Sequence, residues 1–257
     1  MRALALLLLS LALGGCVTTV ETETGRSRKG ADLAEAARLN TQLGMDYMRK
    51  GELDLAQEKL SKALEQDPDL ALAHSTIAFL HSKRGDQKKA EQHYRKALSL
   101  DSSNPSARNN FGVFLCGLNQ FDEAEKLFMQ AAQDRAFKTP EAAWTNAGVC
   151  ARKLPDVARA EQYFRRALEL NPEYPDALAQ LARISLERQD ALRARGFLQR
   201  YERVARETPE TLWMAHTAEA ALGDAEAAER YRRRLIQQFP ESAESQRLQP
   251  ATAPASP

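Results

Sequence analysis

The chain has 257 residues, of which 43% are hydrophobic, 28% charged and 7% aromatic. Helix-favouring Ala, Leu, Glu, Arg and Gln are abundant and β-branched residues are sparse, a composition that predicts an all-α fold. The formal net charge of +1 lacks the strongly basic balance typical of nucleic-acid-binding proteins, so we expect no nucleic-acid partner.

The first 15 residues, MRALALLLLSLALGG, have the pattern of an export signal. One basic residue, Arg2, precedes an apolar run from Ala3 to Leu13 that is interrupted only by Ser10. As a helix this run is about 16 Å long, roughly half of the hydrocarbon core of a bilayer, and is therefore too short to cross a membrane. We predict a signal peptide over residues 1–15.

The end of this segment, Leu13-Gly14-Gly15-Cys16, resembles the lipobox of bacterial lipoproteins, in which the cysteine is acylated and becomes the mature N-terminus. On this resemblance Cys16 carries the lipid, and several acyl chains anchor a protein stably. The alternative is an ordinary signal peptide followed by a chance cysteine. The next residue is Val17 rather than Asp, which by resemblance to the enterobacterial sorting pattern favours the periplasmic face of the outer membrane.

Two polar segments flank the body of the chain. Residues 17–30 are rich in Thr, Glu and Arg without periodic hydrophobicity, so we predict a lipidated cysteine and flexible tether over residues 16–36. The last eight residues, PATAPASP, are of low complexity, and we predict a disordered C-terminal tail over residues 241–257.

Between these segments the sequence repeats with a period near 34 residues. Small residues recur at steps of 34, 34, 36 and 34 residues: Gly44, Ala78, Gly112, Gly148 and Ala182. An alanine column continues through six units: Ala56, Ala90, Ala124, Ala160, Ala194 and Ala228. Small residues at fixed positions let two antiparallel helices approach closely, and large residues such as Leu60, Phe128 and Phe164 fill the space beside them.

This pattern resembles the tetratricopeptide repeat (TPR), and the resemblance implies a right-handed superhelix of six helix-turn-helix repeats. The predicted repeats cover residues 37–70, 71–104, 105–138, 141–174, 175–208 and 209–240. The predicted turns within them lie at Gly51, Gly85, Asn119, Pro155, Gln189 and Gly223. The sixth repeat matches least, since His216 and Arg232 replace a small residue and a large filler. Two extra residues near 137–140 predict a longer loop between the third and fourth repeats.

The sequence contains no convergent set of catalytic groups, so we predict a protein that is not an enzyme and uses no cofactor or small-molecule substrate. His74 and His81 lie seven residues apart on one helix, but no carboxylate or cysteine lies at ligand spacing from them. A structural role is therefore favoured over a metal site. Glycine-rich phosphate loops, G-x-S-x-G motifs and C-x-x-C pairs are absent from the sequence.

TPR arrays present a concave groove lined by the first helix of each repeat. In the family geometry its inward positions here hold Met45, Met48, Phe79, Val113 and Val149. Methionine suits adaptable recognition, and such grooves commonly take a peptide or helix of a partner. The alternative is that a tight superhelix buries these side chains between repeats.

Two cysteines remain beside Cys16. Cys116 and Cys150 lie at nearly matching places on the first helices of the third and fourth repeats. Adjacent packed helices lie about 9–10 Å apart, and side chains that point into that gap could bring their Cα atoms within the roughly 4.4–6.8 Å that a disulfide requires. An exported protein meets an oxidising compartment, so a disulfide is our hypothesis. The alternatives are two buried free thiols or a catalytic thiol, which here lacks a nearby base.

The lipobox, the six repeats and the paired motifs N-F-G-V-F-L-C and W-T-N-A-G-V-C (residues 110–116 and 144–150) resemble the PilW/PilF family of type IV pilus biogenesis lipoproteins. The resemblance implies a pilotin, which binds the pilus secretin subunit and promotes its localisation and multimerisation in the outer membrane. The family's lipidated cysteine maps onto Cys16, its paired cysteines onto Cys116 and Cys150, and its partner groove onto the early repeats. The alternative is an adaptor for cell-wall hydrolases or envelope proteases.

Overall fold

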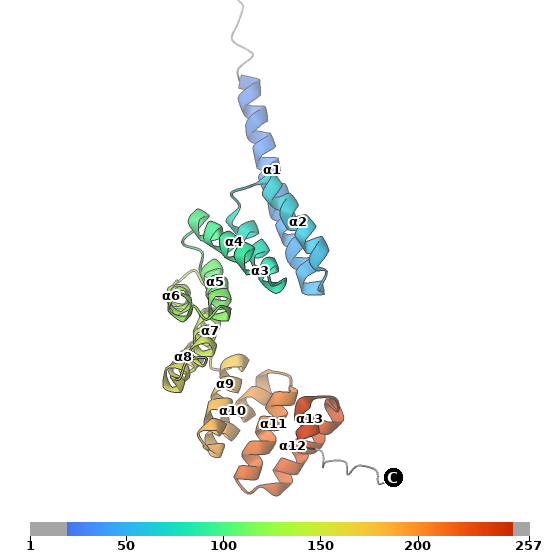
Figure 1. Cartoon of the computed structure of the whole chain (residues 1–257), viewed down its shortest axis with the longest axis vertical. Helices are drawn as coiled ribbons and strands as arrows, with labels where there is room; N and C mark the ends of the chain where they lie inside the picture. Colours follow the sequence, from blue (N-terminus) through green and yellow to red (C-terminus); the bar gives the residue numbers. More distant parts are fainter. Residues whose placement is uncertain (1–19, 249–257) are drawn as a thin grey trace, which may run out of the picture. The chain divides into compact units, whose positions relative to one another are not determined.

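The computed structural model describes residues 20–248. The predicted signal peptide and Cys16 lie outside these residues. The described part of the chain forms thirteen helices and no strand (Figure 1). Twelve of the helices form six consecutive pairs, each in contact along the hairpin, so the prediction of an all-α TPR fold with six repeats is confirmed. The chain divides into two compact units, residues 1–100 and residues 101–257.

The first unit contains the first two repeats. α1 and α2 form one hairpin, α3 and α4 form the next, and α3 contacts both helices of the hairpin before it. The helices are α1 (Val20–Lys50), α2 (Leu53–Gln66), α3 (Ala71–Lys83) and α4 (Gln87–Leu100).

The predicted flexible tether over residues 16–36 differs from the structure. α1 begins at Val20 and is 31 residues long, so it includes residues 20–36 and extends past the end of α2 (Figure 1). The second half of α1 is fixed by packing, since Ala37 and Thr41 are fully buried. Once a helix is nucleated, each further residue adds a hydrogen bond at little cost, so a polar segment without Pro extends it. The local pattern could not show this, because the stabilising contacts lie further along the chain.

The second unit contains the other four repeats and one additional helix. Within it, each first helix from α7 onward contacts the second helix of the preceding repeat. The helices are α5 (Pro105–Gly117), α6 (Phe121–Ala132), α7 (Pro140–Ala151), α8 (Val157–Leu170), α9 (Pro175–Glu187), α10 (Ala191–Val204), α11 (Pro209–Ala221), α12 (Ala225–Gln238) and α13 (Ala243–Leu248).

α13 departs from the predicted disordered tail over residues 241–257. It contacts α11 and α12, and Ser245 is fully buried. The Ser245 hydroxyl donates a hydrogen bond to the Leu235 carbonyl at 3.1 Å. A short helix therefore packs on the last repeat over residues 243–248, and residues 249–257 lie outside the described part of the chain.

Three glycines in the small-residue column determine how closely the two helices of a hairpin approach each other. A Cβ built on Gly44 would lie 2.6 Å from Leu60, one on Gly112 2.7 Å from Phe128, and one on Gly148 2.5 Å from Phe164. All three large side chains are fully buried. These three hairpins therefore pack as predicted, with a small residue of the first helix against a large side chain of the second helix, 16 residues later.

All six turns inside the hairpins lie at the predicted residues, and five of these residues share one backbone conformation. Five of the six predicted turn residues have a left-handed φ between 59° and 80°: Gly51, Gly85, Asn119, Gln189 and Gly223. Pro155 cannot adopt this conformation, because its ring fixes φ near −65°. The fourth hairpin instead uses a longer connection, residues 152–156. The predicted lengthening between repeats three and four is also present, as residues 133–139.

Candidate partner-binding surface

In the first unit, the predicted groove residues lie on the adjacent helices α1 and α3. Phe79 is 40% exposed, and the Lys83 ammonium lies 5.3 Å from the centre of its ring. Met45 is half-buried, and Met48 packs against a core cluster that includes Leu60 and Leu80. Phe79 is therefore available to a partner, whereas Met48 also serves the core, as the alternative reading of the groove allowed.

Leu72 was missed as a groove residue. It precedes Phe79 by seven residues on α3, which places both on the same side of the helix. Leu72 is 44% exposed. The signal was available in the sequence, because Leu72 occupies the second position of its helix, one of the inward positions of the repeat.

In the second unit, Val113 on α5 and Val149 on α7 occupy equivalent positions of adjacent repeats. They are 47% and 42% exposed, although their neighbours along each helix are mostly buried. Beside them the Asn146 amide donates to the Asn109 side-chain oxygen at 3.0 Å, which joins the two helices across the same face. This surface thus consists of two exposed valines bordered by the side-chain amides of Asn109 and Asn146.

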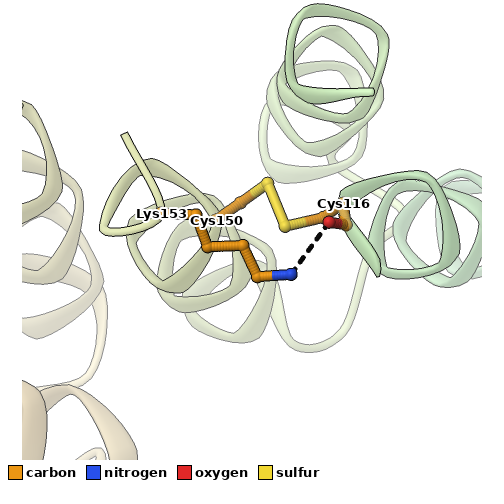
Figure 2. The surroundings of a disulfide bond; sticks show 3 residues. All are labelled: Cys116, Cys150 and Lys153. Atoms are coloured by element: carbon orange, nitrogen blue, oxygen red, sulfur yellow. Dashed lines mark hydrogen bonds between the residues drawn. A yellow bond between two sulfur atoms is a disulfide. The ribbon is translucent and has the colours of Figure 1, made fainter. Parts of the chain in front are cut away.

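A disulfide joins Cys116 on α5 to Cys150 on α7 (Figure 2). The Cα atoms are 5.8 Å apart, and the bond spans 34 residues. The Lys153 ammonium donates to the Cys116 carbonyl at 2.9 Å beside it (Figure 2). The pairing is the one hypothesised from the sequence, and it joins the third repeat to the fourth within three residues of Val113 and Val149 along the two helices.

The histidines of the first unit form a cluster that the sequence showed only in part. His74 and His93 approach with their Nδ1 atoms 2.9 Å apart, and the His81 and His93 rings stack with centroids 5.6 Å apart. His74 Nε2 lies 2.9 Å from the Pro68 carbonyl, so it must carry the proton and donate. His74 Nδ1 is then an acceptor, and the hydrogen bond between the rings comes from His93 Nδ1–H.

This tautomer assignment gives the cluster a structural role. Burial, and the neighbouring rings of His74 and His81, lower the pKa of His93 to about 4. Burial also lowers the pKa of His81, against the opposing charge of Asp86. The His93 and His81 rings are therefore held neutral at ordinary pH, and the contacts among the three rings and the Pro68 carbonyl bind α3, α4 and the loop before α3 together.

Over residues 20–248, no group of three or more His, Cys, Asp or Glu side chains is arranged to hold a metal ion. Over the same residues, no helix is long and apolar enough to span a bilayer.

Models of the tetratricopeptide repeat match residues 35–103, 115–175, and 83–143 with 154–218 of the chain. Across nearly its whole length the chain also resembles one curated protein. It is 30% identical over 248 residues to the type IV pilus assembly protein PilF of Pseudomonas aeruginosa, covering 96% of this chain and 98% of that protein. This chain belongs to the PilF family of TPR proteins.

Two solved structures agree with this membership. The crystal structure of PilW, a widely conserved type IV pilus biogenesis factor, matches with a TM-score of 0.74 and 33% identity over 82% of this chain and 97% of that one. The structure of Pseudomonas aeruginosa PilF matches with a TM-score of 0.75 and 28% identity over 84% and 97% of the two chains. Homology to the PilF family thus assigns the chain to type IV pilus biogenesis as a TPR protein, a class that binds other proteins.

Proposed function

We propose that the protein is a pilotin: an outer-membrane lipoprotein that binds the type IV pilus secretin subunit and promotes its localisation and multimerisation. The observation that carries this proposal is the match to a type IV pilus assembly protein over almost the whole of both chains. Full-length similarity points to a shared role more strongly than similarity of a few repeats, because TPR repeats occur in many unrelated proteins.

Membrane attachment is assigned to Cys16. The charged start, the 11-residue apolar run and the Leu-Gly-Gly-Cys ending together support an acylated cysteine at the start of the mature chain. Val17 after it supports transport to the outer membrane, where the protein faces the periplasm.

Recognition is assigned to the exposed apolar residues of the first helices. Leu72 and Phe79 in the first unit, and Val113 and Val149 in the second, leave apolar surface accessible on a soluble fold. Met45 lies at the position equivalent to Phe79 on the neighbouring helix. A secretin segment with apolar side chains at helical spacing fits either of these two surfaces.

Binding and lipid attachment act together in this mechanism. The lipid restricts the protein to the membrane surface, so a bound secretin subunit is held at high effective concentration where its ring assembles. Assembly of the secretin ring then requires both the exposed groove residues and an intact lipid.

The groove assignment is tested by Phe79→Glu combined with Val113→Glu. Both side chains are substantially exposed, so the charges disturb recognition without opening a cavity. We expect capture of the secretin subunit by the purified protein to fall at least about 10-fold, with an unchanged circular dichroism spectrum.

Leu192→Glu is the matched control, because Leu192 is a highly exposed leucine of α10, outside the first helices. It should leave capture unchanged. Wild-type capture by the double variant would refute the groove assignment, and failure of the wild-type protein to capture the secretin would refute the proposed function.

A further inference from the structure

The side of α1 that faces away from α2 carries exposed leucines. Leu39 is 62% exposed and Leu43 is 36% exposed. The opposite side of the same helix packs on α2: Ala37 and Thr41 are fully buried, and Gly44 is in close approach to Leu60. At about 100° per residue, Leu39 points roughly 200° away from Ala37. The helix thus has two apolar sides, of which one is uncovered.

Equivalent positions in the later repeats are buried. In the second and the fourth to sixth repeats, the residues equivalent to Leu39 are Ala73, Ala143, Ala177 and Thr211, and those equivalent to Leu43 are Ile77, Ala147, Leu181 and Ala215; all are buried. In each of these repeats the first helix contacts the second helix of the repeat before it. α1 has no such helix before it in the described residues. Terminal repeats ordinarily present a polar outer face, and these leucines depart from that rule.

Charged residues are placed symmetrically around the leucines. Asp32 precedes Leu39 by seven residues, and Lys50 follows Leu43 by seven residues. A spacing of seven keeps residues on one side of a helix, so the four side chains form a single row. Asp32 and Lys50 are both exposed. The row reads acidic, apolar, apolar, basic, and it is symmetric about Thr41.

We propose that this row, Asp32, Leu39, Leu43 and Lys50, is an interface between two copies of the chain, with the two α1 helices antiparallel. Antiparallel pairing about Thr41 sets Leu39 opposite Leu43 of the second copy and Asp32 opposite Lys50 of the second copy. Such a two-fold interface is self-complementary, as a homodimer requires. Parallel pairing would instead place like charges opposite each other, which is unfavourable.

The chain's own N-terminal segment cannot cover the row if the signal is cleaved after residue 15. Residues 16–19 span at most about 14 Å, whereas Val20 and Leu39 are roughly 28 Å apart along α1. A second copy is also compatible with the proposed lipid anchor, because a two-fold axis normal to the bilayer lets both Cys16 lipids enter the same membrane.

Sedimentation velocity of the full chain in a mild detergent, over about 1 to 100 µM, tests the interface. We expect the protein mass to double across this range. Leu39→Glu with Leu43→Glu should weaken association at least about 100-fold, since it places four charges in the interface. Leu192→Glu makes the same change on an exposed leucine outside the row and should leave association unchanged.

A charge exchange tests the antiparallel arrangement. Asp32→Lys alone and Lys50→Asp alone should each weaken association about 10-fold, because each creates two like-charge pairs. The two substitutions together restore opposite pairs and should restore association. Three results would overturn the proposal: a single monomer mass up to about 100 µM, a dimer that survives the glutamates, or a double exchange no better than the single ones.

Discussion

Among single residues, the glycines of the first helices determine how closely the hairpins pack. Gly112 and Gly148 each lie over the ring of a fully buried phenylalanine 16 residues later. A ring held on all sides cannot move away from an added methyl group, so these positions tolerate no side chain without strain. In the sixth repeat the pair is replaced: His216 Nδ1 donates to the Ala228 carbonyl at 3.0 Å, and Arg232 pairs with Glu229.

Gly148→Ala should therefore lower the free energy of unfolding of the second unit by about 1–3 kcal/mol, because the new Cβ would lie 2.5 Å from the Phe164 ring. Gly196→Ala is the control, since nothing lies within 4 Å of its position in α10. It should raise the stability by about 0.5–1 kcal/mol through helix propensity. Both tryptophans, Trp144 and Trp213, lie in the second unit, so urea unfolding followed by their fluorescence measures both effects. A Gly148→Ala variant as stable as the wild-type protein would contradict the close packing of Gly148 on Phe164.

The pKa of His93, lowered to about 4, predicts how the stability of the first unit depends on pH. Below the unfolded pKa of about 6.5 the unfolded chain binds a proton that the folded chain does not. The contribution of His93 is thus fully present above about pH 6.5 and is lost as the pH falls towards 4. We expect a loss of about 1–2 kcal/mol over that interval, after allowing for solvent screening.

Hydrogen exchange of the α3 and α4 amides, corrected for the intrinsic effect of pH on exchange, measures this loss. His93→Gln removes the titrating group and keeps a donor for His74 Nδ1. The stability of the first unit in this variant should therefore depend less on pH between pH 6.5 and 4. Parallel profiles for the two proteins would show that His93 is not responsible.

At the scale of elements, neighbouring first helices are held by a covalent bond and by polar contacts. The Cys116–Cys150 disulfide and the Asn109–Asn146 hydrogen bond both join α5 to α7. Packing of the fourth repeat on the third is thereby fixed next to Val113 and Val149. At the end of the second unit, α13 covers α11 and α12, whereas α1 leaves its outward side open.

Replacing both cysteines, Cys116→Ser with Cys150→Ser, should lower the free energy of unfolding of the second unit by about 3–4 kcal/mol, from a closed loop of 34 residues. Urea unfolding followed by tryptophan fluorescence checks this value. Alkylation of denatured wild-type protein from the periplasm, without reductant, provides an independent measurement. Reaction of both thiols there would show that the bond does not form in the cell.

For the whole molecule, the proposed function separates attachment from recognition. Cys16 lies outside the residues that the structure describes, and the exposed apolar residues lie in the repeats. Loss of the lipid should leave the repeats folded and able to bind, while placing the complex in the wrong compartment.

Cys16→Ser is accordingly expected to abolish secretin multimers in the outer-membrane fraction while leaving the helical content and secretin capture of the purified protein unchanged. Fractionation with immunodetection of the secretin gives the first readout, and circular dichroism with a pull-down gives the others. Wild-type amounts of outer-membrane multimers in this variant would contradict the lipid-dependent mechanism.

Much of the fold could be predicted from the sequence because the TPR pattern is local and repeated. The column of small residues, the large side chains beside it and the six turn residues can all be recognised within one 34-residue period. The candidate partner-binding surface was harder to predict from the sequence. Met48 and Phe79 both occupy inward positions, yet Met48 packs against the core and Phe79 is exposed, since the neighbouring helices determine which positions are covered.

The sequence by itself predicted an export signal and a lipobox, and it determined the helical hairpins and the small residues that let them pack, because each depends on residue types within a short segment. Tertiary structure alone decided that residues 20–36 continue α1, that α13 packs on the last repeat, that three histidines cluster, and that Leu39 and Leu43 are uncovered. Each of these depends on which segments, distant in sequence, lie next to one another, and burial and pKa follow from that proximity rather than from the residue type.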